Sequence, residues 1–406
     1  MTRSVVVSGL GALGSFGAGA ASLAQALRIS VPCVSEVDRS SGYHATEGAR
    51  LAALVRGVDF SALVKPAAAR RMSGPSKMAV AAARMAVRDA GLETTREGWD
   101  DTEVVLSTVF GPVDFTDRLV SAITREGPET ASPFHFTESV ANAPTAQIAI
   151  ELQARGPNVT ITQREAGPLI ATFRAARDVA AGRVARALAG SVEEMTPLVH
   201  ALLDRFGALA RPTAAEAEAP RPFDRRRNGF LAGEGATVLV VEREVDTRSR
   251  GGRVLARVCG GASAFDPTAS RVGWGHGAPS LAGAAQRMFE RLGIDAGDID
   301  LVVSGASGAR EGDRLEAEIL ARLFAGRRRP PVLAPKSVTG EYGGGQLAAA
   351  VLAVSGGEFG PTAGFAEADA RCGLVPHAGG MLAGGRVLVS SLAAGGAAAW
   401  MVLERP

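Results

Sequence analysis

The hydrophobic positions of the chain fall into short β-branched runs that alternate with longer Ala-rich stretches. The runs at residues 5–7, 103–108 and 159–162 have the length and the residue types of buried strands. The segment from about residue 169 to residue 189 is rich in Ala and Arg and has the periodicity of a helix. Strands that alternate with Ala-rich helices predict an α/β protein, with mixed sheets covered by helices on both faces.

This pattern occurs twice along the chain. A β-branched run opens the first part at residues 5–7, and a similar run opens the second part at residues 253–258. Residues 242–251, between the two parts, are charged and lack apolar periodicity, which is typical of a join. We therefore predict two similar halves, residues 1–245 and residues 246–406.

Composition narrows the class of protein. The 406 residues are 46% hydrophobic but only 5% aromatic, so the core is built mainly from Ala, Val and Leu. A formal net charge of +2 does not indicate a nucleic-acid surface, and the short basic runs at residues 225–227 and 327–329 are typical of solvated loops. No stretch reaches the roughly 20 uninterrupted apolar residues of a membrane span, so we expect a cytoplasmic protein.

The segment at residues 156–167 combines a predicted strand, a short turn and the start of a helix. Such a turn commonly presents a reactive thiol or hydroxyl, because the helix dipole stabilises negative charge at that end. Here the turn carries Glu165. None of the three cysteines, Cys33, Cys259 and Cys372, follows a strand and opens a helix, which argues against a thiol nucleophile.

A series of short motifs occurs along nearly the whole chain, at residues 4–11, 71–73, 222–224, 229–235, 259–266, 312–318 and 336–340. In this order the motifs resemble those of the β-ketoacyl synthases. The sequence Glu165-Ala166-Gly167 narrows the resemblance to the chain-length factors of type II polyketide synthases, which often have Gln-Ala-Gly there. The glutamate departs from that usual glutamine.

The resemblance also identifies what is missing. The catalytic cysteine of active synthases corresponds to Glu165, and their two histidines correspond to Gly305 and Glu341. The gating Phe of their glycine-rich loop corresponds to Ala394, whereas their lysine is retained as Lys336. Neither Gly nor an ionised Glu donates a hydrogen bond to an oxyanion. The histidines of the chain lie away from these motifs, at His44, His135, His200, His276 and His377.

If the fold follows the resemblance, Glu165, Lys336 and Glu341 converge in one pocket. Two buried carboxylates raise each other's pKa, and a lysine between them neutralises part of their charge. We therefore consider a structural ion cluster in place of the catalytic site. The alternative is that Glu165 faces water at a helix N-terminus, and the sequence does not separate the two.

The resemblance implies a thiolase fold, in which two similar halves pack as alternating helix and mixed-sheet layers (αβαβα). It implies a non-catalytic subunit that forms a heterodimer with an active ketosynthase α subunit. The polyketide intermediate then extends from the partner's cysteine into a tunnel at the interface, where this chain limits its length. Acyl carrier protein acts mainly through the partner, and neither a cofactor nor a metal is expected.

The resemblance also places a gate in the tunnel. Val113, Thr116 and Val120 share one helical face, and Phe134 and Phe136 line the interface downstream. Some relatives that make aromatic polyketides carry Phe at the two Val positions, so a longer or wider tunnel is implied here. Ordinary core packing of an interface helix predicts the same apolar face and remains open, as does the product class, a poly-β-ketone or a polyene.

Other functions compete with this one. Gly9, Gly11 and Gly14 follow a predicted strand with the spacing of a dinucleotide-binding turn, and Asp38 lies further on, but a clear second strand is lacking. A malonyl-carrier-protein decarboxylase that forms the starter unit is another alternative. A homodimeric structural or regulatory protein is the third.

Overall fold

The computed structural model describes residues 4–92 and 98–406. One continuous sheet runs through the molecule in the order β12–β11–β15–β16–β10–β1–β9–β7–β5–β6, and the short β2 (Gly17–Ala18) pairs with β1. The strands of its first part are β1 (Val5–Gly14), β9 (Gly235–Arg243), β7 (Arg186–Glu193), β5 (Thr102–Ser107) and β6 (Asn158–Ile161). Those of its second part are β10 (Ala256–Phe265), β16 (Ala397–Glu404), β15 (Arg386–Leu392), β11 (Leu301–Val303) and β12 (Val332–Leu333).

The two parts of the sheet repeat the same strand order and directions. In the first part β1, β9 and β7 are antiparallel neighbours, and β5 and β6 continue parallel to β7. In the second part β10, β16 and β15 are antiparallel, and β11 and β12 continue parallel to β15. The parts meet where β1 pairs with β10, at Val6↔Arg257 and Val7↔Ala256. The predicted boundary at residues 245 and 246 falls within α9 (Glu244–Ser249) and stays a prediction.

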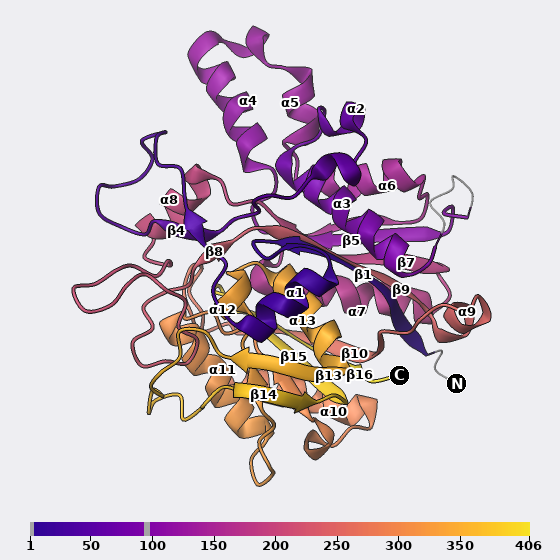
Figure 1. Ribbon diagram of the computed structural model, residues 1–406, viewed down its shortest axis with the longest axis vertical. Helices are drawn as coiled ribbons and strands as arrows, with labels where there is room; N and C mark the ends of the chain where they lie inside the picture. The colour runs from indigo at the N-terminus through magenta and orange to yellow at the C-terminus, as the bar shows by residue number, and fades with distance from the viewer. Residues whose placement is uncertain (1–3, 93–97) are drawn as a thin grey trace.

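The helices form three layers around the two parts of the sheet (Figure 1). Helices α7 (Gly167–Ala180) and α13 (Gly343–Val354) lie in the middle and contact strands of both parts. Helices α3 (Gly74–Asp89) and α6 (Ala143–Leu152) cover the first part, and α10 (Ala278–Leu292) and α11 (Arg310–Leu323) cover the second. The predicted αβαβα layering of a thiolase fold is thus confirmed.

The glycines that match a dinucleotide-binding turn have a packing role. Gly9, Gly11 and Gly14 all lie within β1, not at a turn between a strand and a helix. A Cβ atom on Gly9 or Gly11 would clash with the backbone carbonyl oxygens of Ala86 and Ala82 in α3. Gly9 and Gly11 therefore allow the backbones of α3 and β1 to approach each other closely.

Two local predictions are wrong. The helix expected from about residue 169 to 189 ends at Ala180, and β7 begins at Arg186. The side chains of β7 are buried under α7 on one face of the sheet and under α3 on the other, and this burial outweighs the helix preference of Ala. Strand β6 lies at the edge of the sheet and is half-buried, whereas a buried strand was expected. The charged stretch at residues 242–251 contains the end of β9 and the helix α9, and its role as the join between the halves stays a prediction.

Smaller elements surround this body. They are α1 (Ala20–Ile29), α2 (Pro66–Ala69), α8 (Pro197–Arg205), α12 (Lys336–Thr339), the sheet of β3 (Ser35–Glu36), β4 (Leu51–Ala53) and β8 (Ala232–Gly233), and the hairpin of β13 (Gly356–Pro361) and β14 (Ala378–Ala383). Short 3₁₀ helices are η1 (Phe60–Ala62), η2 (Pro128–Thr130), η3 (Arg164–Ala166) and η4 (Ala296–Asp298). Within the described residues, no helix combines the length and the hydropathy needed to cross a membrane.

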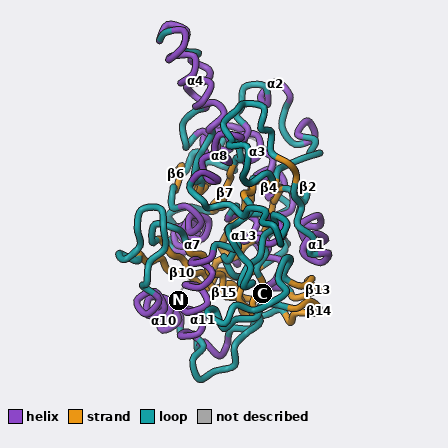
Figure 2. Tube along the Cα trace, turned by 90° about the vertical axis from the view of Figure 1, so that its left-hand side faces the viewer, coloured by secondary structure: helices purple, strands orange, loops and turns teal. Residues whose placement is uncertain are grey.

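Helices α4 (Val113–Glu126) and α5 (Pro133–Glu138) form an arm that projects from the body (Figures 1 and 2). No side chain of α4 is fully buried. We call these two helices and the residues between them the α4–α5 arm.

Candidate functional site

The middle helices α7 and α13 begin beside each other. Gly343, the first residue of α13, packs against Pro168 in the first turn of α7. Glu165 and Glu341 each stand two residues before the first residue of their helix. Corresponding positions of the two halves therefore bring two carboxylates to the same place, between the two parts of the sheet.

Lys336 neutralises part of this negative charge. Its side chain has no exposed surface, and its Nζ lies 2.5 Å from Oε1 of Glu341. Neither atom has a hydrogen-bond partner of good geometry among the described residues, so the contact is an ion pair.

Glu165 lies close to this ion pair, and its own environment disfavours ionisation. Burial and, to a smaller extent, the nearby charge of Glu341 raise the pKa of Glu165 to about 7, although Lys336 opposes both effects. The buried Oε2 of Glu165 has no hydrogen-bond partner in the described part of the chain. The structure thus brings all three predicted residues together in one cluster, in which Glu165 is partly exposed.

The backbone at Gly305 leaves little room for a side chain. A Cβ atom there would lie 2.9 Å from the carbonyl oxygen of Ser390 and 3.1 Å from Cα of Ser391. The amide of Gly305 donates to the carboxylate of Glu316 at 3.2 Å. A larger residue would therefore require the backbone of β15 to shift.

Glu165, Gly305 and Glu341 line a cavity of about 420 Å³, which we call the outer cavity. Phe206, Phe230 and Trp274 contribute aromatic side chains to its wall. Leu392, at the end of β15, and Ala394, just after it, also line the outer cavity. Phe206 is 72% exposed, which places the mouth of the outer cavity at the surface near the end of α8.

A second, smaller cavity of about 60 Å³ lies beyond Glu165, and we call it the inner cavity. Its wall comes from the ends of β5 and β7, the start of α7, helix α8 and the segment before α13. Glu193 lines it and fixes the turn after β5, because its carboxylate accepts hydrogen bonds from the amides of Val109 at 2.6 Å and Phe110 at 3.1 Å. Burial raises the pKa of Glu193 to about 7.

Arg164 is a site residue that the sequence analysis missed. Its backbone has a φ of 47°, a conformation that non-glycine residues rarely adopt. Its guanidinium donates to the carbonyl oxygens of Ala394 at 2.8 Å and Arg271 at 3.1 Å. Arg164 therefore ties the turn that carries Glu165 to the loop after β15. The only sign of this role in the sequence is that Arg164, a long cationic residue, directly precedes Glu165.

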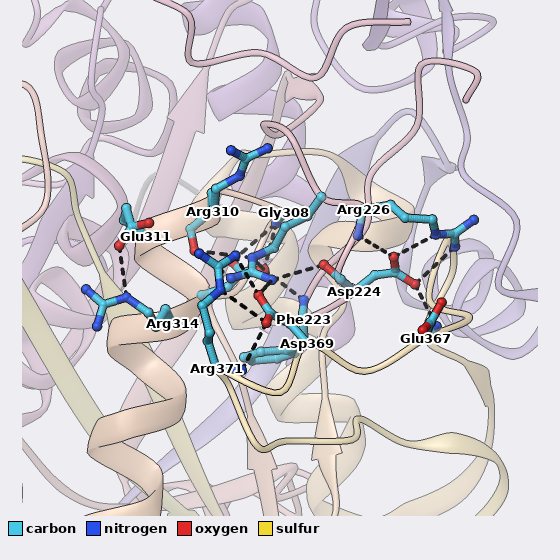
Figure 3. A network of polar contacts seen from close by, with 12 residues as sticks. Phe223, Asp224, Arg226, Gly308, Arg310, Glu311, Arg314, Glu367, Asp369 and Arg371 are labelled. Carbon is cyan, nitrogen blue, oxygen red and sulfur yellow. Dashed lines mark hydrogen bonds and ion pairs between the residues drawn. The ribbon is translucent and has the colours of Figure 1, made fainter. Parts of the chain in front are cut away.

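A buried network of charges supports the wall of the outer cavity (Figure 3). Arg227 has no exposed side-chain surface and donates to Asp369 at 2.8 Å and to the carbonyl oxygen of Arg310 at 2.8 Å. Asp313 accepts from the amides of Phe223 at 2.8 Å and Ser307 at 3.2 Å. Burial raises the pKa of Asp313 to about 6, although the backbone donors and Arg227 oppose this effect. The network holds segments of both halves around the cavity.

The predicted gate residues lie on the α4–α5 arm. Val113 packs partly buried at the root of the arm, and the hydroxyl of Thr116 donates to the carbonyl oxygen of Pro112 at 3.0 Å. Val120 is 50% exposed and Phe136 is 62% exposed, whereas Phe134 packs against Phe115 at 5.7 Å between ring centroids. None of the five residues lines the outer or the inner cavity.

The cysteines and histidines that the structure describes lie outside both cavities. Burial raises the pKa of Cys259 and of Cys372 to about 11, which keeps both as thiols at neutral pH. Nε2 of His44 lies 3.0 Å from Nδ1 of His200, a residue of α8. Within residues 4–92 and 98–406, no group of His, Cys, Asp and Glu has an arrangement that would hold a metal ion.

Two family models match the chain. Residues 2–247 match the model described as "Beta-ketoacyl synthase, N-terminal domain", and residues 255–366 match "Beta-ketoacyl synthase, C-terminal domain".

Individual proteins extend this similarity. The "Granaticin polyketide putative beta-ketoacyl synthase 2" of Streptomyces violaceoruber is 35% identical over 69% of this chain and 66% of that protein. The "Tetracenomycin polyketide synthase ketoacyl synthase beta subunit" of Streptomyces glaucescens is 32% identical over 89% of this chain and 88% of that protein. A solved structure, "The ishigamide ketosynthase/chain length factor", matches with a TM-score of 0.88 and 27% identity over 100% of both chains.

Proposed function

Because the chain belongs to the β-ketoacyl synthase family, we propose that it is the chain-length factor of a type II polyketide synthase. In this proposal it forms a heterodimer with an active ketosynthase, which carries out the condensations with carrier-protein-bound units. This chain contributes the closed end of the tunnel that receives the growing polyketide. Its similarity to a ketosynthase β subunit and to a ketosynthase/chain length factor structure supports this role.

The observation that carries the proposal is the replacement of the whole catalytic set. Glu165 occupies the turn where the cysteine of an active synthase would stand, and Gly305 has little room for any side chain. Glu341 is paired with the buried Lys336 and is an acceptor, so it does not stabilise a developing oxyanion. The same geometry counts against the decarboxylase alternative, because that reaction also needs donors to an oxyanion.

The α4–α5 arm supports the expectation of a protein partner. Val120, Ile123 and Phe136 are exposed apolar side chains on this projecting element, at 50%, 37% and 62% of their surface. Edge strand β6 lies at the end of the sheet in the same half. Exposed apolar surface of this kind is stabilised when a partner covers it.

Co-expression with the ketosynthase α subunit of a type II polyketide synthase, followed by native mass spectrometry, tests the proposal. We expect a one-to-one heterodimer that makes polyketide from malonyl carrier protein. Replacing the partner's catalytic cysteine with Ala should abolish product, whereas Glu165→Gln in this chain should leave condensation within about twofold. A homodimer that ignores the ketosynthase would contradict the proposal and favour a structural or regulatory protein.

A further inference from the structure

The outer and inner cavities are divided by a wall of three side chains. Only Glu165, Phe230 and Glu341 line both cavities, as far as the described residues define them. The wall therefore consists of one aromatic ring and two carboxylates. An acyl chain in either cavity would meet this wall.

The wall is fixed in place by contacts outside the cavities. The ion pair between Lys336 and Glu341 is buried, so moving Glu341 would leave a lysine without its counter-charge. Phe230 belongs to the backbone ladder beside α8, since its amide donates to Ala208 at 3.1 Å and its carbonyl accepts from Ala210 at 2.8 Å. Both parts of the wall are thus anchored by interactions that an apolar ligand does not replace.

The most exposed residue in the lining of the inner cavity lies next to the α4–α5 arm. Among the described residues that line it, Phe110 alone is exposed, at 41% of its surface. Phe110 stands three residues before the first residue of α4, and Glu193 holds its backbone amide. A ligand that enters the inner cavity past Phe110 comes from the surface on which the arm stands, not from the mouth of the outer cavity.

The size and lining of the inner cavity suit the end of an acyl chain. Val109, Met195, Leu203 and Phe230 provide apolar walls, and the carboxylate of Glu193 is occupied by backbone donors. The volume of about 60 Å³ equals roughly two water molecules. That space accommodates a terminal alkyl or alkenyl segment and not the body of a polyketide.

We propose that the inner cavity receives the apolar leading end of the acyl chain and that Phe230, beside the Glu165–Glu341 pair, is the side chain at which elongation stops. Leu203 sets the width of this end position from α8. The inference rests on the proposed function, and it moves the length-determining contact away from Val113, Thr116 and Val120 on the arm.

Product lengths from the reconstituted heterodimer test this assignment. Leu203→Phe fills the inner cavity, and we expect the major product to shorten by one ketide unit. The matched control is Leu202→Phe, because Leu202 is the neighbouring residue on α8, is 46% exposed and does not line the inner cavity. Native mass spectrometry of each variant checks that the heterodimer still forms.

A second variant, with the opposite expected effect on product length, tests the inference even if Leu203→Phe fails to fold. Phe230→Leu replaces the aromatic ring between the two cavities with a smaller side chain. The major product should therefore lengthen by at least one ketide unit. Phe265→Leu is its control, since Phe265 is 64% exposed and lines neither cavity. If Leu203→Phe and Phe230→Leu both make products of the wild-type length, the inference is overturned.

Val120→Phe on the arm separates failure of the inference from failure of the proposed function. If Val120→Phe shortens the product while the inner-cavity variants do not, the gate lies on the arm and the proposed function stands. If none of these variants changes length in an active heterodimer, this chain does not limit length, and both ideas fail. If the wild-type chain forms no heterodimer, both are likewise rejected.

Discussion

Lys336 has no exposed surface, and its Nζ lies 2.5 Å from Glu341. At the residue scale we therefore predict that Lys336→Met destabilises the fold by about 3–5 kcal/mol near pH 8, because it leaves buried carboxylates without a counter-charge. Thermal unfolding measures the loss. Lys65→Met is the matched control, because Lys65 is exposed. Unchanged melting of the Lys336 variant would show that the cluster does not hold the site together.

The ionisation of Glu165 gives a second prediction at this scale. Its folded pKa of about 7 lies above the ordinary value of 4.5, chiefly because the carboxyl is buried. Between these values the unfolded chain releases the proton while the folded chain retains it, so stability falls as pH rises from about 4.5 to about 7 and stays lower above that.

Glu165→Gln removes this loss, so the variant should gain stability relative to wild type as pH rises, by at most about 3 kcal/mol at pH 8. Chemical unfolding at pH 5 and pH 8 measures the effect. Glu129→Gln serves as control, since Glu129 is an exposed residue of η2. An equal difference from wild type at both pH values would mean that Glu165 titrates normally in the folded protein.

At the scale of elements, the α4–α5 arm projects from the body (Figure 1) and carries exposed apolar side chains. We predict that Phe136→Asp lowers the affinity for the ketosynthase at least tenfold, about 1.4 kcal/mol, because it places a charge on the apolar surface where we propose that the partner binds. Val245→Asp is the control, since Val245 is 67% exposed on the distant α9. Titration of the two purified subunits measures affinity. Equal binding by both variants would place the interface elsewhere.

At the scale of the whole molecule, Arg227 connects the two halves. It precedes β8 in the chain, and it pairs with Asp369 at 2.8 Å and lies 3.9 Å from Asp313 in α11. Arg227→Met leaves Asp313 buried without its cation and leaves Asp369 paired only with the exposed Arg371, and it should cost about 3–5 kcal/mol.

The adjacent Arg225 offers a matched control for this variant. Its side chain is 60% exposed, so Arg225→Met should change stability by less than about 1 kcal/mol. Equilibrium unfolding measures both variants. Similar small losses would show that the network in Figure 3 is not needed to hold the halves together.

Much of this organisation is local and was therefore accessible from the sequence. The β-branched runs and the Ala-rich helices follow from the spacing of apolar residues, and their repetition indicates two halves. The glutamate at the turn is also a local feature, because Glu165 stands between a strand and a helix whatever surrounds it. The convergence of Glu165, Lys336 and Glu341 was expected only through the family resemblance, since residues so far apart in the chain meet only after folding.

Tertiary packing decided the rest. Residues 186–193 form a strand because β5 and β9 pair with their backbone and helices α7 and α3 cover their two faces, although their Ala content suits a helix. The wall between the cavities depends on Phe230 lying against two carboxylates from other segments, and the link from Arg164 to Ala394 spans both halves. The periodicity of a chain records which face of an element is apolar, but the identity of the segment that covers that face depends on long-range packing.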